Sequence, residues 1–446
     1  MKHLVVEQTS DRKTTNLRHK VATRRVALIG GTTAFADCLV ALRYLADPHQ
    51  LVQGTAIAEY EQAFAQQIGV RYAYSFCHGR VGLYGLLRAL GIGPGDEVLL
   101  QVPTHIVVSN AIRYTGARPV YADCQLDTYN MDLEHAEQRI TPRTKALVLQ
   151  HTFGNPVDLD AALELTRRHG LDLIEDCVHA LGATYNGRPV GSFGRAAFFS
   201  SEETKTISTT MGGMVVTDDS QLAERIQAFQ QSCACPSAWQ TARYVLKLVL
   251  YHGMTEPHLH LYTRAIYEFF GKRNPLPQPT TDEETHGVRP TNYELRLSNA
   301  QAALGLRQLQ RLESNLAHRR TTARAYSKLL SEAEFNVPHS PAWAEPAFVR
   351  YPVWVEDPAA TVRAVGPHAT LGTWFSSVLE EADSPACGDY EMGSCPRAEE
   401  AAKHLINLPT NPRVSPQDVE TIVSAVVRAE TMARGRAHGN YPLSIH

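Results

Sequence analysis

The segment FFSSEETKTISTTMGGMVVTDD, residues 198–219, predicts two buried strands joined by a polar turn. The turn holds one lysine, Lys205, and a glycine pair follows it before the second apolar run. A lone lysine in a turn is usually a solvated side chain. The rest of the sequence must therefore show whether Lys205 has a chemical role.

Composition limits the possible classes of protein. The chain has 446 residues, with 43% hydrophobic and 20% charged, which is typical of a globular protein of two or three structural units. A formal net charge of −3 gives no reason to expect nucleic acid as a partner. Eight cysteines are too few for a disulfide scaffold, and Cys233 and Cys235 form a C-x-C with no second pair at metal-ligand spacing. We expect no metal site, and reduced thiols in the cytoplasm.

The N-terminal 25 residues are polar and basic, and we expect them to form a loosely held arm. They lack the apolar core of a signal peptide. No run in the chain approaches the ~18 apolar residues of a spanning helix. We therefore expect no transmembrane segment.

From Ala56 onward, apolar strand-like runs alternate with segments of helical periodicity. The predicted strands are residues 70–76, 98–103, 118–124, 145–154, 171–177 and 196–199, and the predicted helices are 56–69, 80–91, 105–116, 133–140 and 158–170. This alternation predicts an α/β fold with a mostly parallel sheet covered by helices on both faces. Ligands of such sheets bind at the carboxyl ends of the strands.

The second half of the chain is organised differently. Residues 220–290 break the alternation and predict two apolar helices around Pro257, followed by a polar, Pro-rich loop. Residues 295–333 predict a long amphipathic helical region, and residues 340–435 alternate again. We expect an N-terminal arm and helix (1–50), a large domain (51–315) with inserted helices at about 236–280, and a small C-terminal α/β domain (316–446).

Several polar residues stand at the ends of the predicted strands, where a lysine could bind pyridoxal phosphate (PLP). Such a site needs an acid at the ring nitrogen, donors for the phosphate and a flat group on the ring. Asp176 closes an apolar strand and could be the acid; alone, it could equally be a helix N-cap. Gly79 and Arg80 begin a helix whose N–H groups favour phosphate, although an ordinary helix start explains them as well.

Two further residues complete this hypothesis. Ser200, five residues before Lys205, could give a hydroxyl to the phosphate, and His105 could lie flat on the ring. A histidine in this position is more often simply packed or solvated.

From about Gly54 to Leu312, and more loosely to its end, the chain resembles the DegT/DnrJ/StrS family of PLP-dependent sugar aminotransferases. The motifs that carry the resemblance are LLRALGIGPGDEVLL, NAIRYTGARPVYAD, ITPRTKALVLQHTFGNPVDLD, IEDCVHALGATYNGRPVGSFGRAAFFS, SNAQAALGLRQLQRL and CPRAEEAAKHLINLPTNPRVS. The resemblance implies a fold type I PLP-dependent transferase with a seven-stranded sheet. It also implies a homodimer with shared active sites.

The resemblance implies a role for each candidate residue. Lys205 stands at the position of the Schiff-base lysine and Asp176 at that of the pyridinium partner. The remaining cofactor-binding positions are those of the ring-hydroxyl contact His179, the stacking residue His105, the phosphate-binding Gly79 and Arg80, and Ser200.

The chain departs from the family pattern at several positions. His78-Gly79-Arg80 replaces Ser-Gly-Thr, and Met211 replaces a common acidic residue. The family's loop that sends an asparagine to the neighbouring subunit reads RPTNYELRLS, which puts Glu294 at the asparagine position and leaves Asn292 as a possible substitute. The segment LGTWFSSVLEEADSP lacks the histidine or tyrosine typical of a nucleotide-sugar pocket.

The resemblance implies transfer of an amino group from an amino acid, glutamate by family analogy, to a keto or aldehyde carbon of a sugar or natural-product intermediate. Other PLP chemistry, such as decarboxylation, cyclisation or dehydration, is an alternative. The family's dehydratases place histidine at the lysine position, so Lys205 argues against dehydration. A non-catalytic PLP-binding regulator is a third possibility. The insertion at 238–279 could cover the active-site mouth or bind a carrier-linked substrate, or be buried at a dimer contact.

Overall fold

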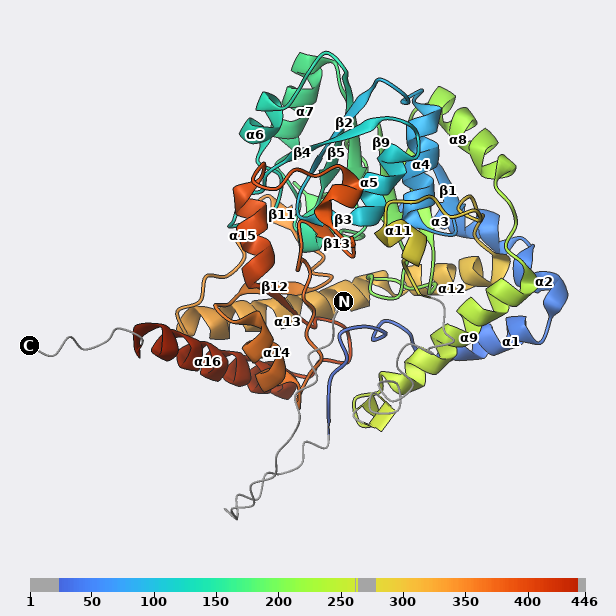
Figure 1. Ribbon diagram of the computed structural model, residues 1–446. Coiled ribbons are helices and arrows are strands. Elements are labelled where there is room, and N and C mark those ends of the chain that lie inside the picture. Colours follow the sequence, from blue (N-terminus) through green and yellow to red (C-terminus); the bar gives the residue numbers. More distant parts are fainter. Residues whose placement is uncertain (1–23, 261, 264–277, 440–446) are drawn as a thin grey trace, which may run out of the picture.

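A seven-stranded sheet, in the order β1-β10-β9-β6-β5-β2-β4, lies at the centre of the computed structural model (Figure 1). The structure describes residues 24–260, 262–263 and 278–439. The strands of this sheet are β1 (Tyr72–Phe76), β2 (Glu97–Gln101), β4 (Arg118–Ala122), β5 (Thr144–Gln150), β6 (Asp172–Asp176), β9 (Ala196–Ser200) and β10 (Gly213–Thr217). Only β10 runs against its neighbours. The predicted mostly parallel seven-stranded sheet is therefore confirmed.

Side chains of the strands alternate between two apolar cores, one on each face of the sheet. In β5, Leu147 and Leu149 face one core, whereas Ala146 and Val148 face the other. The first core is completed by α3 (Ala56–Ile68), α7 (Leu159–His169) and α12 (Asn299–Leu309). The second is completed by α4 (Gly79–Ala89), α5 (Ile106–Arg113) and α8 (Ser220–Ser232). Burial on both faces explains why the strands read as continuous apolar runs.

The start of β10 presses against the start of α4. A Cβ atom at Gly213 would lie 2.3 Å from the backbone nitrogen of Gly79 and 2.4 Å from the carbonyl carbon of His78. Only a glycine allows this approach of two backbones. The contact fixes the first turn of α4 beside the turn that carries Lys205.

We predicted that the strand–helix alternation stops at residue 220, and for residues 220–232 this prediction is wrong. Helix α8 follows β10 directly and packs on α4 and β1, so the alternation continues to Ser232. Helix α9 (Ala238–Met254) then packs with α1 (Phe35–Leu45), α2 (Pro48–Val52) and α12. The second apolar helix, predicted after Pro257, lies largely outside the described residues. The loop predicted as polar contains a short helix, α11 (Asp282–Thr285).

The C-terminal part forms a separate apolar core. It is built from α13 (Leu312–Glu332), β12 (Tyr351–Trp354), α14 (Pro358–Val365), β14 (Leu405–Leu408) and α16 (Pro416–Gly439). Two short strands return to the N-terminal half: β13 (Leu379–Glu380) pairs with β3 (Thr104–His105), and β11 (Ala344–Glu345) pairs with β7 (Thr184–Tyr185). The α/β character agrees with expectation, and the domain boundaries stay a prediction.

The predicted loose arm does not extend to residue 25. Arg24 forms an ion pair with Asp418 at 3.1 Å, and the Arg25 amide donates to the carbonyl of Pro257. Val26 is fully buried and bridges to Ala369 in the C-terminal core. Residues 1–23 lie outside the described part of the chain. Within that part, no helix combines the length and hydropathy needed to cross a bilayer.

Replacing Gly213 by alanine should destabilise the protein. The new methyl group would displace the start of α4 or of β10, and overpacking of this kind costs about 1–3 kcal/mol. A lower urea midpoint and weaker PLP binding should follow. The matched control is Gly253→Ala in α9, where a Cβ atom meets nothing within 4 Å. Equal midpoints for the two variants would contradict the proposed backbone contact.

Candidate active site

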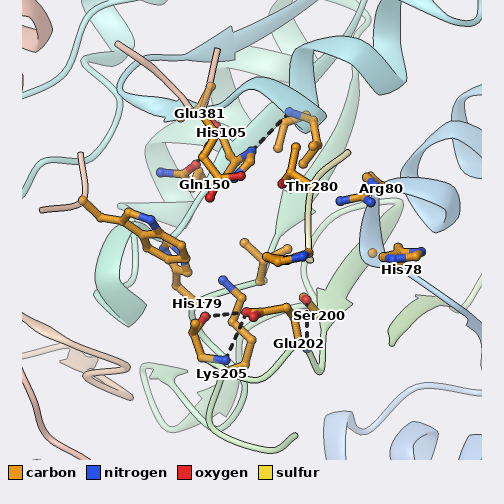
Figure 2. A pocket seen from close by; sticks show the side chains of 18 of the residues that line it. His78, Arg80, His105, Gln150, His179, Ser200, Glu202, Lys205, Thr280 and Glu381 are labelled. Atoms are coloured by element: carbon orange, nitrogen blue, oxygen red, sulfur yellow. Dashed lines mark hydrogen bonds and ion pairs between the residues drawn. The ribbon is translucent and has the colours of Figure 1, made fainter. Parts of the chain in front are cut away.

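A cavity of about 240 Å³ lies at the carboxyl ends of the parallel strands (Figure 2). Its walls come from seven parts of the chain: the start of α4, the β3–α5 junction, the end of β5, the segment after β6, the β9–β10 connection, residues 279–280 and the C-terminal part. The main polar and aromatic residues that line it are His78, Arg80, His105, Gln150, His179, Ser200, Glu202, Lys205, Thr280, Arg350, Trp374 and Glu381. Strand-end residues far apart in the sequence thus meet in one pocket.

Lys205 is buried in the turn between β9 and β10, with 7% of its surface exposed. Its backbone amide donates to the carbonyl of Glu202, and its Nζ lies 4.4 Å from the centre of the Trp374 ring. Burial lowers the pKa of Lys205 to about 8, with a further lowering effect from Arg350, although Glu202 and Asp176 oppose it. A neutral amine is therefore accessible near neutral pH, as a nucleophile requires.

Asp176 is the last residue of β6 and is 1% exposed. Its Oδ1 accepts from the amide of Val178 at 3.1 Å, whereas its buried Oδ2 has no hydrogen-bond partner among the described residues. Burial raises the pKa of Asp176 to about 7, opposed by the Val178 N–H and by the charge of Lys205. Asp176 is not a lining residue, but its carboxylate accepts a hydrogen bond from Val178, which is one. Its free oxygen fits a protonated ring nitrogen.

His179 is a buried, neutral histidine held between aromatic rings. Its ring stacks on Phe153 at 6.2 Å and on Trp374 at 5.2 Å between centroids. Burial and the charge of Lys205 hold its pKa well below the usual range. Its Nδ1 is buried and lacks a partner within the part of the chain that the structure describes. This atom is available to a group bound in the pocket.

His105 lines the pocket, but its two ring nitrogens are engaged. Nδ1 accepts from the amide of Val107 at 3.3 Å, which caps α5, and Nε2 lies 3.3 Å from a carboxylate oxygen of Glu381. The ring meets Trp374 edge-on. These contacts fix the His105 ring in the pocket wall, and the predicted stacking on a cofactor stays a prediction.

The predicted phosphate-binding end contains Gly79, Arg80 and Ser200. Gly79 and Arg80 open α4, whose first amides have no partner within the helix. Ser200 Oγ accepts from the amide of Glu202 at 3.2 Å. However, Arg80 Nε lies 2.7 Å from Glu284, a carboxylate with 1% of its side chain exposed. The charge of Arg80 is thus already balanced within the chain, and the phosphate-binding roles of Gly79, Arg80 and Ser200 stay a prediction.

The 290–298 loop does not reach the pocket of its own chain. Asn292 is exposed and is not a lining residue, and Glu294 pairs with Arg289. Tyr293 is buried and donates to the carbonyl of Arg80 at 3.1 Å. The prediction that Asn292 serves a neighbouring subunit is compatible with its exposure and stays a prediction.

The inserted helix α9 supports the Lys205 turn from behind. Lys247 Nζ lies 2.7 Å from Glu203, two residues before Lys205, and the Thr210 hydroxyl donates to the carbonyl of Tyr244. Lys247 is 1% exposed, so this ion pair is shielded from solvent. Helix α9 is therefore a structural support of the site, whereas Pro279, at the end of the insertion, lines the cavity itself.

Sequence reasoning missed several lining residues. Trp374, Phe375 and Glu381 come from the segment LGTWFSSVLEEADSP, for which the sequence predicts no pocket residue. Arg350 precedes a short strand of the C-terminal core, and no periodicity marks it. Gln150 could have been found, because it ends strand β5 and obeys the strand-end rule used for Asp176.

One buried cluster has ligand types of a metal site: His151, Glu175 and Cys177. Both nitrogens of His151 are used, one by Glu175 at 3.2 Å and one by the amide of Val157. Glu175 also accepts from three backbone amides between residues 191 and 194. These contacts make the cluster an internal brace of the fold.

Comparison with known proteins agrees with this geometry. The model of the DegT/DnrJ/EryC1/StrS aminotransferase family matches residues 36–427. The chain belongs to this family. The predicted PLP-dependent aminotransferase activity and the fold type I architecture are thereby confirmed.

Individual relatives cover most of this aminotransferase. GDP-perosamine synthase of Caulobacter vibrioides is 31% identical over 84% of this chain and 90% of its own length. The spore coat polysaccharide biosynthesis protein SpsC of Bacillus subtilis is 31% identical, with the same coverage. The crystal structure of S. venezuelae DesV is 28% identical, with a TM-score of 0.69 over 89% of this chain and 94% of that one.

The pocket of this aminotransferase fits PLP. It combines a buried primary amine (Lys205), a carboxylate oxygen without a described partner (Asp176) and a helix start packed so closely that glycine is required at Gly79 and Gly213. A Cβ atom at Gly79 would lie 2.9 Å from the carbonyl oxygen of Phe199. These features match the three needs of the cofactor: an amine, a ring-nitrogen partner and amide donors.

The rate of covalent PLP capture by the cofactor-free enzyme should rise with pH through a midpoint near 8. A lowered lysine pKa makes roughly a tenth of Lys205 neutral at pH 7, and the neutral fraction increases as pH rises through the pKa. Rapid mixing with PLP, followed by borohydride trapping and peptide mass spectrometry, would measure capture at Lys205. The Lys205→Ala variant should show none. A midpoint near 10.5 would contradict the burial argument.

Proposed function

We propose that this aminotransferase moves an amino group from glutamate to a carbonyl carbon of a sugar, using Lys205 and Asp176. The observation that carries the proposal is the burial of an amine with a pKa of about 8 together with a carboxylate whose Oδ2 has no described partner. The names of GDP-perosamine synthase and of the spore coat polysaccharide protein support a sugar acceptor. Glutamate as donor rests on family analogy.

Each residue has a definite task in this proposal. PLP, when bound, supplies an electron sink for the carbon that loses a proton. Lys205 holds the cofactor and then moves the proton as general base and acid, work worth roughly 10²–10⁴-fold in rate. Asp176 keeps the ring nitrogen protonated. His179 contacts the ring hydroxyl, His105 bounds the ring, and the amides of Gly79 and Arg80 with Ser200 hold the phosphate.

We also propose a homodimer that works in the cytoplasm. Helices α1 and α9, which pack together, carry exposed apolar side chains on their outer faces: Phe35, Leu39, Leu42, Trp239, Leu246 and Leu250. Exposed apolar residues gathered on one face are typical of protein interfaces. All eight cysteines lie in the described residues without a disulfide, as expected for a reducing compartment.

Amine transfer from ¹⁵N-glutamate tests the proposed reaction. Glutamate should convert the bound cofactor from the PLP to the pyridoxamine phosphate spectrum, and ¹⁵N should appear on a member of a panel of nucleotide-linked keto sugars and cyclitol ketones. Lys205→Ala should abolish turnover, and Asp176→Asn should lower it by several orders of magnitude while leaving the fold intact. Bound PLP that no amino acid converts would contradict transamination.

Complementation tests the shared site. If Asn292 reaches the neighbouring pocket, Asn292→Ala should weaken PLP binding, and sedimentation should show a dimer. In mixed dimers of Asn292→Ala with Lys205→Ala, one of the two pockets combines an intact Lys205 with an intact Asn292. Wild-type PLP affinity should return in that pocket. A monomeric active enzyme, or mixed dimers without recovery, would exclude this arrangement.

A further inference from the structure

Arg350 is a buried cation in the pocket wall opposite the helix start. It stands just before β12, is 4% exposed and lines the cavity. Its Cζ lies 3.6 Å from the centre of the Trp374 ring, so the guanidinium is stacked on the indole. A Cβ atom at Gly372 would lie 2.9 Å from Nη1 of Arg350. The indole and this glycine together hold the guanidinium in place.

The guanidinium of Arg350 lacks a polar partner. Among residues 24–260, 262–263 and 278–439, no hydrogen bond or ion pair joins it. Other buried arginines of the region are satisfied: Arg80 by Glu284, and Arg319 by the carbonyl of Val349 and two further acceptors. Burial lowers the pKa of Arg350 to about 10, because removing the charged guanidinium from water is unfavourable. A buried cation of this kind calls for an anion.

The carboxylates near Arg350 are held elsewhere. Glu202, Glu380 and Glu381 stabilise its charge through space without forming an ion pair with it. Each accepts hydrogen bonds from its own surroundings: Glu202 from Thr204, Glu380 from Ser376 and Glu381 from His105. One oxygen of Glu202 is buried without a described partner, so Glu202 is the competing internal anion that a test must address.

The phosphate end of the pocket is not where Arg350 lies. Figure 2 shows His78 and Arg80 on one side of the cavity and His179 on the other. Trp374 stacks on His179, and Arg350 stacks on Trp374, which puts the unpaired guanidinium on the His179 side. An anion bound by Arg350 would therefore occupy a different position from a phosphate bound at the start of α4.

We propose that Arg350 binds the α-carboxylate of the amino donor. This inference rests on the proposed transamination. In any α-amino acid the carboxylate carbon is two bonds from the nitrogen that must reach the Lys205 position, and Lys205 Nζ lies 4.4 Å from the ring on which Arg350 is stacked. The planar guanidinium fork matches a carboxylate in a bidentate manner. Arg350 thus selects donors with an α-carboxylate, a group that the proposed sugar acceptor lacks.

Two ligands that differ in the α-carboxylate test this assignment in the PLP-loaded enzyme. Calorimetry would measure binding of 2-methylglutamate, which has an α-carboxylate but no α-proton, and of 4-aminobutyrate, which lacks the α-carboxylate. Arg350→Gln should weaken 2-methylglutamate on the order of 100-fold and leave 4-aminobutyrate within about twofold. Arg350→Lys keeps a point charge and should weaken only 2-methylglutamate, roughly tenfold.

Two control variants show whether the loss of affinity belongs to Arg350 itself. Arg167→Gln removes an exposed arginine of α7 and should change neither ligand. Glu202→Gln should strengthen or preserve 2-methylglutamate binding, because the internal competitor loses its charge. If Arg350→Gln does not fold, the affinities of the two ligands are compared in Arg350→Lys. Equal weakening of both ligands, or none, overturns the role of Arg350, whereas absence of ¹⁵N transfer by the wild-type enzyme overturns the proposed function instead.

Discussion

The site depends on one constraint: the amine of Lys205 and the carboxylate of Asp176 are both buried at the strand ends. Lys205 and Asp176 each lose most of their hydration, and their pKa values move toward one another, to about 8 and about 7. In water both would be fully ionised at neutral pH, and the amine would be a poor nucleophile. The parallel sheet makes this burial possible, because helices cover both of its faces and leave only the strand ends open.

The reversed strand β10 gives the lysine its position. The chain that leaves β9 returns through the connection 201–212 and not through a crossover helix, so Lys205 stays at the strand ends with Ser200 and Asp176. This reversal also brings Gly213 of β10 against Gly79, the first residue of α4. The start of α4 and the connection that carries Lys205 are therefore held together by a backbone contact. Helix α9 supports the same turn through the Lys247–Glu203 ion pair.

Local pattern predicted the sheet and most of the strand-end residues because both follow from periodicity. Runs such as LDLIEDC alternate between two cores, and a polar residue at the end of such a run must face the open edge, as Asp176 does. Glu284, the partner of Arg80, lies in a segment predicted as loop, and a sequence gives no sign of ion pairs across such distances. For the same reason Trp374 and Arg350 were missed: tertiary packing alone brings them to the pocket.

The two ends of the pocket differ in whether their arginine is paired with a carboxylate of the chain. At the start of α4, Glu284 neutralises Arg80, so the proposed phosphate site there depends on amide N–H groups and the helix dipole. On the Trp374 side, Arg350 is held by an aromatic face and a glycine, and no described carboxylate pairs with it. A cofactor that stays bound suits the end at α4, where the charge of Arg80 is already paired with Glu284. A carboxylate that must enter and leave in every catalytic cycle suits a cation whose position is fixed by stacking, because the guanidinium is already ordered before the carboxylate binds.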